Sequence, residues 1–113
     1  MAPATRTPAG PAPAAAPAPP VREVLTADAQ AALTPAAVIA DLKAGNERFA
    51  AGEETLRDYN AQAAATASGQ YPKAMILSCL DSRVPVEIIF DQGIGDVFVG
   101  RVAGNVEDVA MLG

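Results

Sequence analysis

The chain has 113 residues, of which 13 are acidic and 8 are basic, with no histidine and one cysteine. A net charge of −5 without a cluster of basic side chains argues against a nucleic-acid partner, and no apolar run is long enough to cross a membrane. The single cysteine, Cys79, excludes an intramolecular disulfide framework.

The first part of the chain, residues 1–20, consists almost entirely of Ala and Pro, with Arg6 as its one charged side chain. Pro lacks a backbone donor and Ala offers little apolar surface, so burial cannot offset the entropy that ordering would remove. We therefore expect a disordered tail over 1–20 and a folded part over 21–113. Such a tail suits a cytoplasmic protein as well as one exported to the periplasm, so the compartment stays open.

Helices are expected before any strand. An Ala-rich segment over 26–33 favours the first helix. Thr34 followed by Pro35 is typical of the start of a second, with Thr as N-cap and Pro at the first helical position. Gly52 is a candidate C-cap, and Gly45 should weaken this helix by about 1 kcal/mol relative to Ala. The apolar side chains that fall near one face are Val38, Leu42 and Phe49.

Residues 53–72 are polar and end in the loop signal Gly69-Gln70-Tyr71-Pro72. The continuous apolar run over 74–79 then predicts a strand that is buried on both faces. Residues 84–90 predict a short helix that is closed by Gly93.

Residues 96–102 predict a second strand, after which Ala103-Gly104-Asn105 turns into another helix with Asn105 as a candidate N-cap. Strand, helix and strand in this order predict a βαβ crossover, and hence an α/β fold with a partial parallel sheet that follows the N-terminal helices. Two strands do not make a stable parallel sheet, so we expect 21–113 to be the N-terminal part of a larger domain.

Reactive side chains gather where the first predicted strand ends. Cys79, Asp81 and Arg83 lie there, and ligands of open α/β sheets bind outside the carboxyl ends of the strands. A thiolate serves as a metal ligand or a nucleophile, and Asp81 is close enough to Arg83 to pair with it. From spacing alone, a small buried hydrophobe remains the better interpretation of Cys79, with a capping acid and a surface cation beside it.

A wider pattern changes that balance, because residues 34–113 resemble the β-class carbonic anhydrases. The matching residues keep the order and the separations of that family's first metal motif, which makes chance agreement a poor explanation. They are Gly45-Asn46-x-Arg48-Phe49, Gln70 in a Gly-Gln-x-Pro context, Cys79-x-Asp81-Ser82-Arg83, Glu87, Phe90, Gly95-Asp96, Phe98, Arg101 and Ala103-Gly104-Asn105.

The resemblance implies a zinc enzyme that reversibly hydrates carbon dioxide to bicarbonate as a homodimer or larger homo-oligomer. It makes Cys79 the first zinc ligand, and Asp81 with Arg83 the catalytic dyad beside the metal. In a closed state of the family, Asp81 itself becomes a zinc ligand. Gln70 would hydrogen-bond bicarbonate, often across the dimer interface, and Gly104 would let the backbone approach the substrate closely.

The family completes its zinc site with a His-x-x-Cys pair, whereas this chain has no His and no second Cys. We therefore expect the full-length protein to be a carbonic anhydrase and this chain to be inactive by itself, since a catalytic zinc site typically needs three protein ligands. Two alternatives remain open. One is a non-catalytic, carbonic-anhydrase-like dimerisation module, and the other is a hydrolase of a sulfur analogue of carbon dioxide on the same scaffold.

Overall fold

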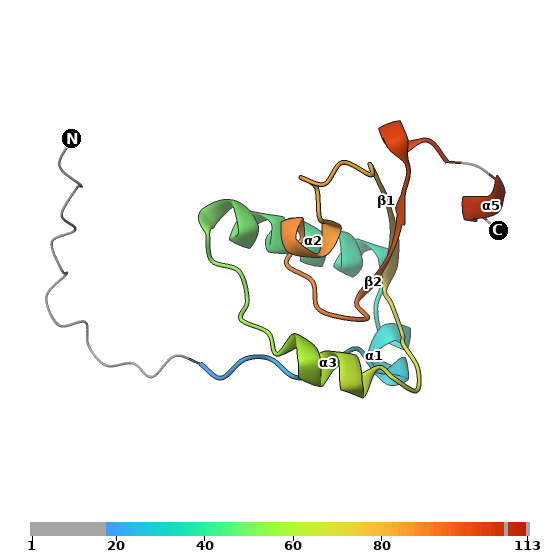
Figure 1. Cartoon of the computed structure of the whole chain (residues 1–113). Helices are drawn as coiled ribbons and strands as arrows, with labels where there is room; N and C mark the ends of the chain where they lie inside the picture. Colours follow the sequence, from blue (N-terminus) through green and yellow to red (C-terminus); the bar gives the residue numbers. More distant parts are fainter. Residues whose placement is uncertain (1–17, 108, 113) are drawn as a thin grey trace, which may run out of the picture.

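The computed structural model describes residues 18–107 and 109–112, and its elements follow the order expected for an α/β chain (Figure 1). The predicted fold class is therefore confirmed, while most of the tail predicted over 1–20 lies outside the described residues. The elements are α1 (Ala27–Ala31), α2 (Pro35–Ala51), α3 (Tyr59–Ala65), β1 (Ala74–Ser78), α4 (Val86–Ile89), β2 (Val97–Arg101), the 3-10 turn η1 (Ala103–Asn105) and α5 (Val109–Leu112).

The two strands form a parallel pair, which confirms the predicted βαβ unit with α4 between them in sequence. The register runs from Ala74 opposite Val97 to Ser78 opposite Arg101. In Figure 1, α2 and α4 lie on one side of this sheet and α5 lies on the other. The carboxyl ends of both strands therefore meet at one edge, next to η1.

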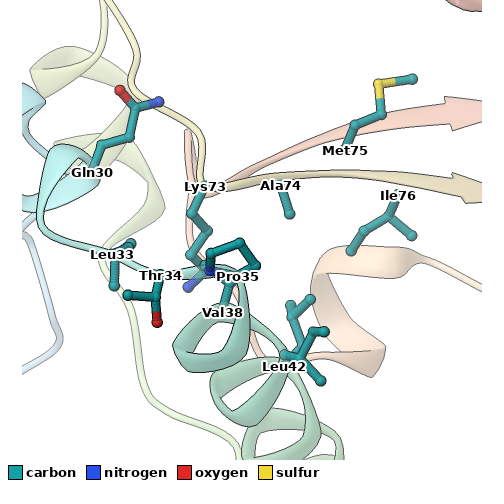
Figure 2. Close-up of a pocket in the computed structure, with 11 residues that line it drawn as sticks. Gln30, Leu33, Thr34, Pro35, Val38, Leu42, Lys73, Ala74, Met75 and Ile76 are labelled. Carbon is teal, nitrogen blue, oxygen red and sulfur yellow. The ribbon is translucent and has the colours of Figure 1, made fainter.

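The prediction that β1 is buried on both faces is wrong for the described part of the chain. Met75 is 54% exposed, and its neighbour across the sheet, Phe98, is 49% exposed. Figure 2 shows Ala74 and Ile76 pointing towards α2, while Met75 points away from it. Because side chains alternate along a strand, α2 covers one face of β1, and the opposite face, on the side of α5, stays partly exposed at Met75.

Helix α2 begins and ends as its sequence predicts. The Thr34 hydroxyl accepts a hydrogen bond from the backbone N–H of Ala37 at 3.2 Å. Gly52 is the C-cap in a left-handed conformation, with φ of 71°, which glycine adopts without a steric penalty. The preceding helix α1 is also confirmed, with Thr26 as its N-cap.

Gly45 was predicted to be only a weakness of α2, and the structure corrects that view. A Cβ at Gly45 would overlap the carbonyl oxygen of Phe90, so glycine is what allows α2 to lie against the end of α4. Asn46 strengthens the same contact by donating to the Ile89 carbonyl at 3.1 Å. Local propensity could not reveal this, because the reason for the glycine lies some 40 residues away in sequence.

Two local predictions miss their targets. The polar stretch over 53–72 contains α3, a helix not predicted, which is capped by Asp58 through the N–H of Ala61 at 3.0 Å. Asn105 is not the N-cap of the last helix, because α5 begins only at Val109. Asn105 instead ends η1 in a left-handed conformation, with φ of 58°, which Asn tolerates better than most residues.

In the part of the chain that the structure describes, the buried apolar side chains are Val38, at 9% exposed, and Val86, at 3% exposed. Polar side chains are buried as well, and Gln62, at 1% exposed, joins separate segments by accepting from the Ile94 N–H and donating to the Glu23 carbonyl. Within the same described ranges, no helix combines the length and the apolar character that crossing a membrane requires.

Candidate functional site

Cys79 lies directly after β1, at the edge of the sheet where both strands end. The parallel ladder continues past the strands, because the Val102 N–H donates to the Ser78 carbonyl and the Leu80 N–H donates to the Val102 carbonyl, each at 3.2 Å. This continuation holds Cys79 beside η1, which follows β2.

Cys79 is half-buried, and the backbone that follows it and the backbone of η1 act on its thiol. The backbone N–H groups of Asp81 and Gly104 lower the pKa of Cys79, and together they outweigh partial desolvation and the negative charge of Asp81, which raise it. Gly104 reaches this position with φ of 73°, a conformation that glycine adopts readily. A thiol that accepts N–H groups in this way is better suited to ligation than an inert core cysteine.

Asp81 and Arg83 form the pair that their spacing predicts. The Arg83 side chain donates from Nε to Asp81 Oδ1 at 3.0 Å and from Nη2 to Oδ2 at 2.7 Å, and the backbone N–H of Arg83 donates to Oδ1 at 2.8 Å. The guanidinium and this N–H hold the pKa of Asp81 below its usual range, and Asp81 raises the pKa of Arg83 in turn. Both carboxylate oxygens therefore face Arg83 in this arrangement.

Gln70 does not join these residues within the chain. It is exposed in the loop between α3 and β1, and that loop leads into the opposite end of β1 from Cys79. A strand of five residues is about 16 Å long, which separates Gln70 from the thiol. The structure thus brings together Cys79, Asp81, Arg83 and Gly104, and it leaves Gln70 apart.

The ligand atoms at this edge of the sheet can be compared with those that zinc requires. A thiolate and a carboxylate are ligands that zinc takes in proteins, and the backbone donors around Cys79 favour the thiolate form. Within residues 18–107 and 109–112, however, no group of three or more Cys, His, Asp or Glu side chains is placed to hold a metal ion. Cys79 and Asp81 therefore fit part of a zinc site and do not complete one.

A groove of about 440 Å³ lies elsewhere, between the start of α2 and β1 (Figure 2). Its lining is mostly apolar and includes Val38, Leu42 and Ile76, together with Lys73. None of the predicted site residues lines this groove, so its chemistry is unrelated to that of the strand edge that holds Cys79.

Two hydrogen-bonding residues were not singled out from the sequence, Arg101 beside Cys79 and Asp91 after α4. Arg101 donates from Nε to the Cys79 carbonyl at 2.8 Å and from Nη2 to the Asp81 carbonyl. Asp91, only 4% exposed, accepts hydrogen bonds from Arg48 Nε at 2.6 Å and from the Thr55 hydroxyl at 2.7 Å. Arg101 appeared only as one member of a motif, and no local pattern marks Asp91.

Comparison with known proteins gives this site a context. A family model described as carbonic anhydrase matches residues 74–113, the segment that begins with β1 and includes Cys79. Carbonic anhydrase 2 of Mycobacterium tuberculosis is 52% identical over 80 residues, and a carbonic anhydrase of Mycolicibacterium smegmatis is 46% identical over 80 residues. Each of these alignments covers 70% of this chain and 39% of the relative.

A more distant relative, a carbonic anhydrase of Synechococcus elongatus, is 44% identical over 39 residues, which are 34% of this chain and 14% of that protein. The fold and the site thus define an α/β segment with a thiol, a carboxylate and a guanidinium at the carboxyl end of a parallel strand. Residues 74–113 are thus similar to the carbonic anhydrase family, and the predicted resemblance is confirmed. The chain spans 39% of the length of the mycobacterial relatives.

Proposed function

We propose that this chain is part of a zinc-dependent enzyme that reversibly hydrates carbon dioxide to bicarbonate, and that it supplies the first half of the active site. The observation that carries the proposal is the arrangement around Cys79. A thiol with backbone donors lies beside an ionised Asp81–Arg83 pair, in the segment that matches the carbonic anhydrase family.

In this proposal, each residue of the strand edge has a separate task. Cys79 would hold the zinc ion, which when bound supplies the Lewis acid that makes water a nucleophile near neutral pH. Asp81, ionised and oriented by Arg83, would accept a hydrogen bond from the attacking water and so aim it at the substrate carbon. Gly104 would keep the backbone close to the thiol.

The 113 residues should not catalyse the reaction unaided. They contain no His and one Cys, so three protein ligands for zinc are not available from the residues of the usual ligand pattern. We infer that a His and a second Cys, spaced His-x-x-Cys, come from a segment outside this sequence. A chelator-sensitive hydration rate in the 113-residue chain would overturn this inference.

Gln70 suggests that a second subunit takes part. Because Gln70 lies at the far end of β1 from Cys79, it could meet bicarbonate only in a neighbouring copy of the site. We therefore propose a homodimer or larger homo-oligomer in which Gln70 of one protomer faces Cys79 of another. Exposed apolar side chains on β1 and β2, such as Met75 and Phe98, support association, since large exposed apolar patches mark interaction surfaces.

The function is tested by comparing the 113-residue chain with the longest product of its reading frame. Zinc per chain is measured by elemental analysis, and carbon dioxide hydration is measured by stopped flow with and without chelator. We expect hydration and about one zinc per chain in a product that contains His-x-x-Cys, with both lost in Cys79→Ala. If the zinc-loaded protein hydrolyses the sulfur analogue and does not hydrate carbon dioxide, the proposed substrate is wrong and the sulfur analogue takes its place.

A further inference from the structure

A single guanidinium holds the turn that presents Cys79 and Asp81. Arg101 is the last residue of β2 and pairs with Ser78 of β1, so its side chain starts beside the residue that precedes Cys79. Its Nε donates to the Cys79 carbonyl at 2.8 Å, and its Nη2 donates to the Asp81 carbonyl. One planar group therefore binds two carbonyls that are two residues apart.

The peptide between these two carbonyls is the important one. The N–H of Asp81 belongs to the peptide bond that joins Leu80 to Asp81, and this N–H is one of the backbone groups that lower the pKa of the Cys79 thiol. Arg101 holds the carbonyl of the preceding peptide and the carbonyl of the following peptide. Fixing both neighbours restricts rotation of the peptide in the middle, so its N–H stays directed at sulfur.

Other contacts of the turn do not replace this one. The Leu80 N–H donates to the Val102 carbonyl at 3.2 Å and fixes the same Cys79–Leu80 peptide whose carbonyl Arg101 binds, while the Val84 N–H donates to the Asp81 carbonyl at 3.2 Å from within the turn itself. Arg83 binds the carboxylate of Asp81, and that ion pair is largely exposed, with the Arg83 side chain 86% exposed. Among these contacts, the bond from Arg101 to the Asp81 carbonyl is the one that joins Asp81 itself to β2.

We propose that Arg101 is a positioning residue of the site, which acts by fixing the backbone of residues 79–81 so that the thiol of Cys79 and the carboxylate of Asp81 are presented together. The biological meaning of this role rests on the proposed function, but the role itself is a property of the metal-free chain. Arg101 need not touch substrate or metal to exert it.

The test uses the metal-free, ¹⁵N-labelled 113-residue chain and compares Arg101→Met, Arg101→Lys and the control Arg22→Met. Arg22 is a suitable control because it is an exposed arginine whose one ion pair, with Asp58, lies far along the chain from Cys79. In Arg101→Met, we expect the backbone order parameters of residues 80–82 to fall from about 0.85 to below about 0.6, with those of α2 and the melting temperature unchanged. Lysine should not restore order, because an ammonium cannot bind two carbonyls as a planar fork does.

A second measurement follows ligand presentation without catalysis. Cadmium, a soft ion that prefers thiolate, is titrated into each variant while its thiolate absorption is recorded. Arg101→Met and Arg101→Lys should bind cadmium about 10-fold more weakly than the wild type and the Arg22→Met control. The proposal is overturned if a folded Arg101→Met keeps the order parameters of residues 80–82 and its affinity for cadmium. It is also overturned if Arg101→Lys restores both, or if Arg101→Met loses order throughout the chain. Failure of the proposed function would appear instead as a longer product without zinc or hydration, with these results unchanged.

Discussion

Replacing Asp91 with Asn should remove a large fraction of this chain's free energy of unfolding. Asp91 follows α4, is 4% exposed, and has φ of 48°, a left-handed value that Asp and Asn tolerate better than other residues with a side chain. Its carboxylate accepts from Arg48 Nε at 2.6 Å, from the Thr55 hydroxyl at 2.7 Å and from the Thr55 N–H at 3.1 Å. Asn keeps the size and the backbone preference, so the substitution removes the charge and turns one acceptor oxygen into an NH₂ donor that faces other donors.

The magnitude follows from what remains after the charge is lost. Breaking a buried ion pair by removing one partner costs about 3–5 kcal/mol, because the other charge stays buried without compensation. Here the remaining cations differ, since Arg57, 3.7 Å from the carboxylate, is 12% exposed, whereas Arg48 is 36% exposed and can regain water. We therefore expect the lower end of the range, about 3 kcal/mol, from a total that is about 5–15 kcal/mol in typical domains.

The assay is urea unfolding followed by far-ultraviolet circular dichroism, with Asp91→Asn and Asp91→Ala compared against Arg22→Met. Ala adds the cost of a left-handed backbone, about 1 kcal/mol or more. Arg22→Met removes an ion pair whose arginine is 71% exposed, which should cost about 0.5 kcal/mol or less. If Asp91→Asn lowers the free energy of unfolding by less than about 1 kcal/mol, the reasoning is refuted, because the buried charge would then not be the main stabilising contact.

Three further predictions use the same unfolding assay. Burial opposes ionisation of Asp91, but hydrogen bonds from Arg48 and Thr55 outweigh it and hold the pKa of Asp91 below its usual value. Its contribution to stability should thus be complete above about pH 4 and be lost as the pH falls through the lowered pKa, so acidification should destabilise the wild type more than Asp91→Asn, and equal losses would contradict this. Gly45→Ala should lower stability by about 1–2 kcal/mol net, because its Cβ would overlap the Phe90 carbonyl oxygen and this outweighs the roughly 1 kcal/mol gained in helix propensity; a stabilised variant would show that α4 can shift. Gly104→Ala should cost about 1 kcal/mol through its φ of 73°, while Gly104→Asn should cost less, and an equal cost for both would point to crowding instead.

The features that could be predicted from the sequence are those whose causes lie within a few residues. Thr34 caps α2 through the N–H of Ala37, and Gly52 ends that helix, so both boundaries depend on local geometry. The apolar runs that form β1 and β2 are also local signals. The same holds for the Asp81–Arg83 pair, which is two residues apart.

What could not be predicted depends on contacts between distant segments. Gly45 looks unfavourable in a helix until the Phe90 carbonyl is placed against it. Asp91 has no local motif, and its partners Arg48 and Thr55 lie 43 and 36 residues away. The exposure of Met75 was missed for a related reason, since an apolar run shows that a strand needs cover without showing which face receives it.

These distant contacts explain how the segment over 79–91 is held although few apolar side chains of the described chain are buried. At its beginning, Arg101 binds the backbone of the turn that carries Cys79. At its end, Asp91 binds Arg48 of α2 and so joins α4 to the longest helix. These two sets of hydrogen bonds differ in burial, because the Asp91 carboxylate is buried and Arg101 is exposed. Loss of Asp91 should therefore weaken the whole fold, whereas loss of Arg101 should loosen the turn and leave the fold intact, which separates the stability of this chain from the geometry of its site.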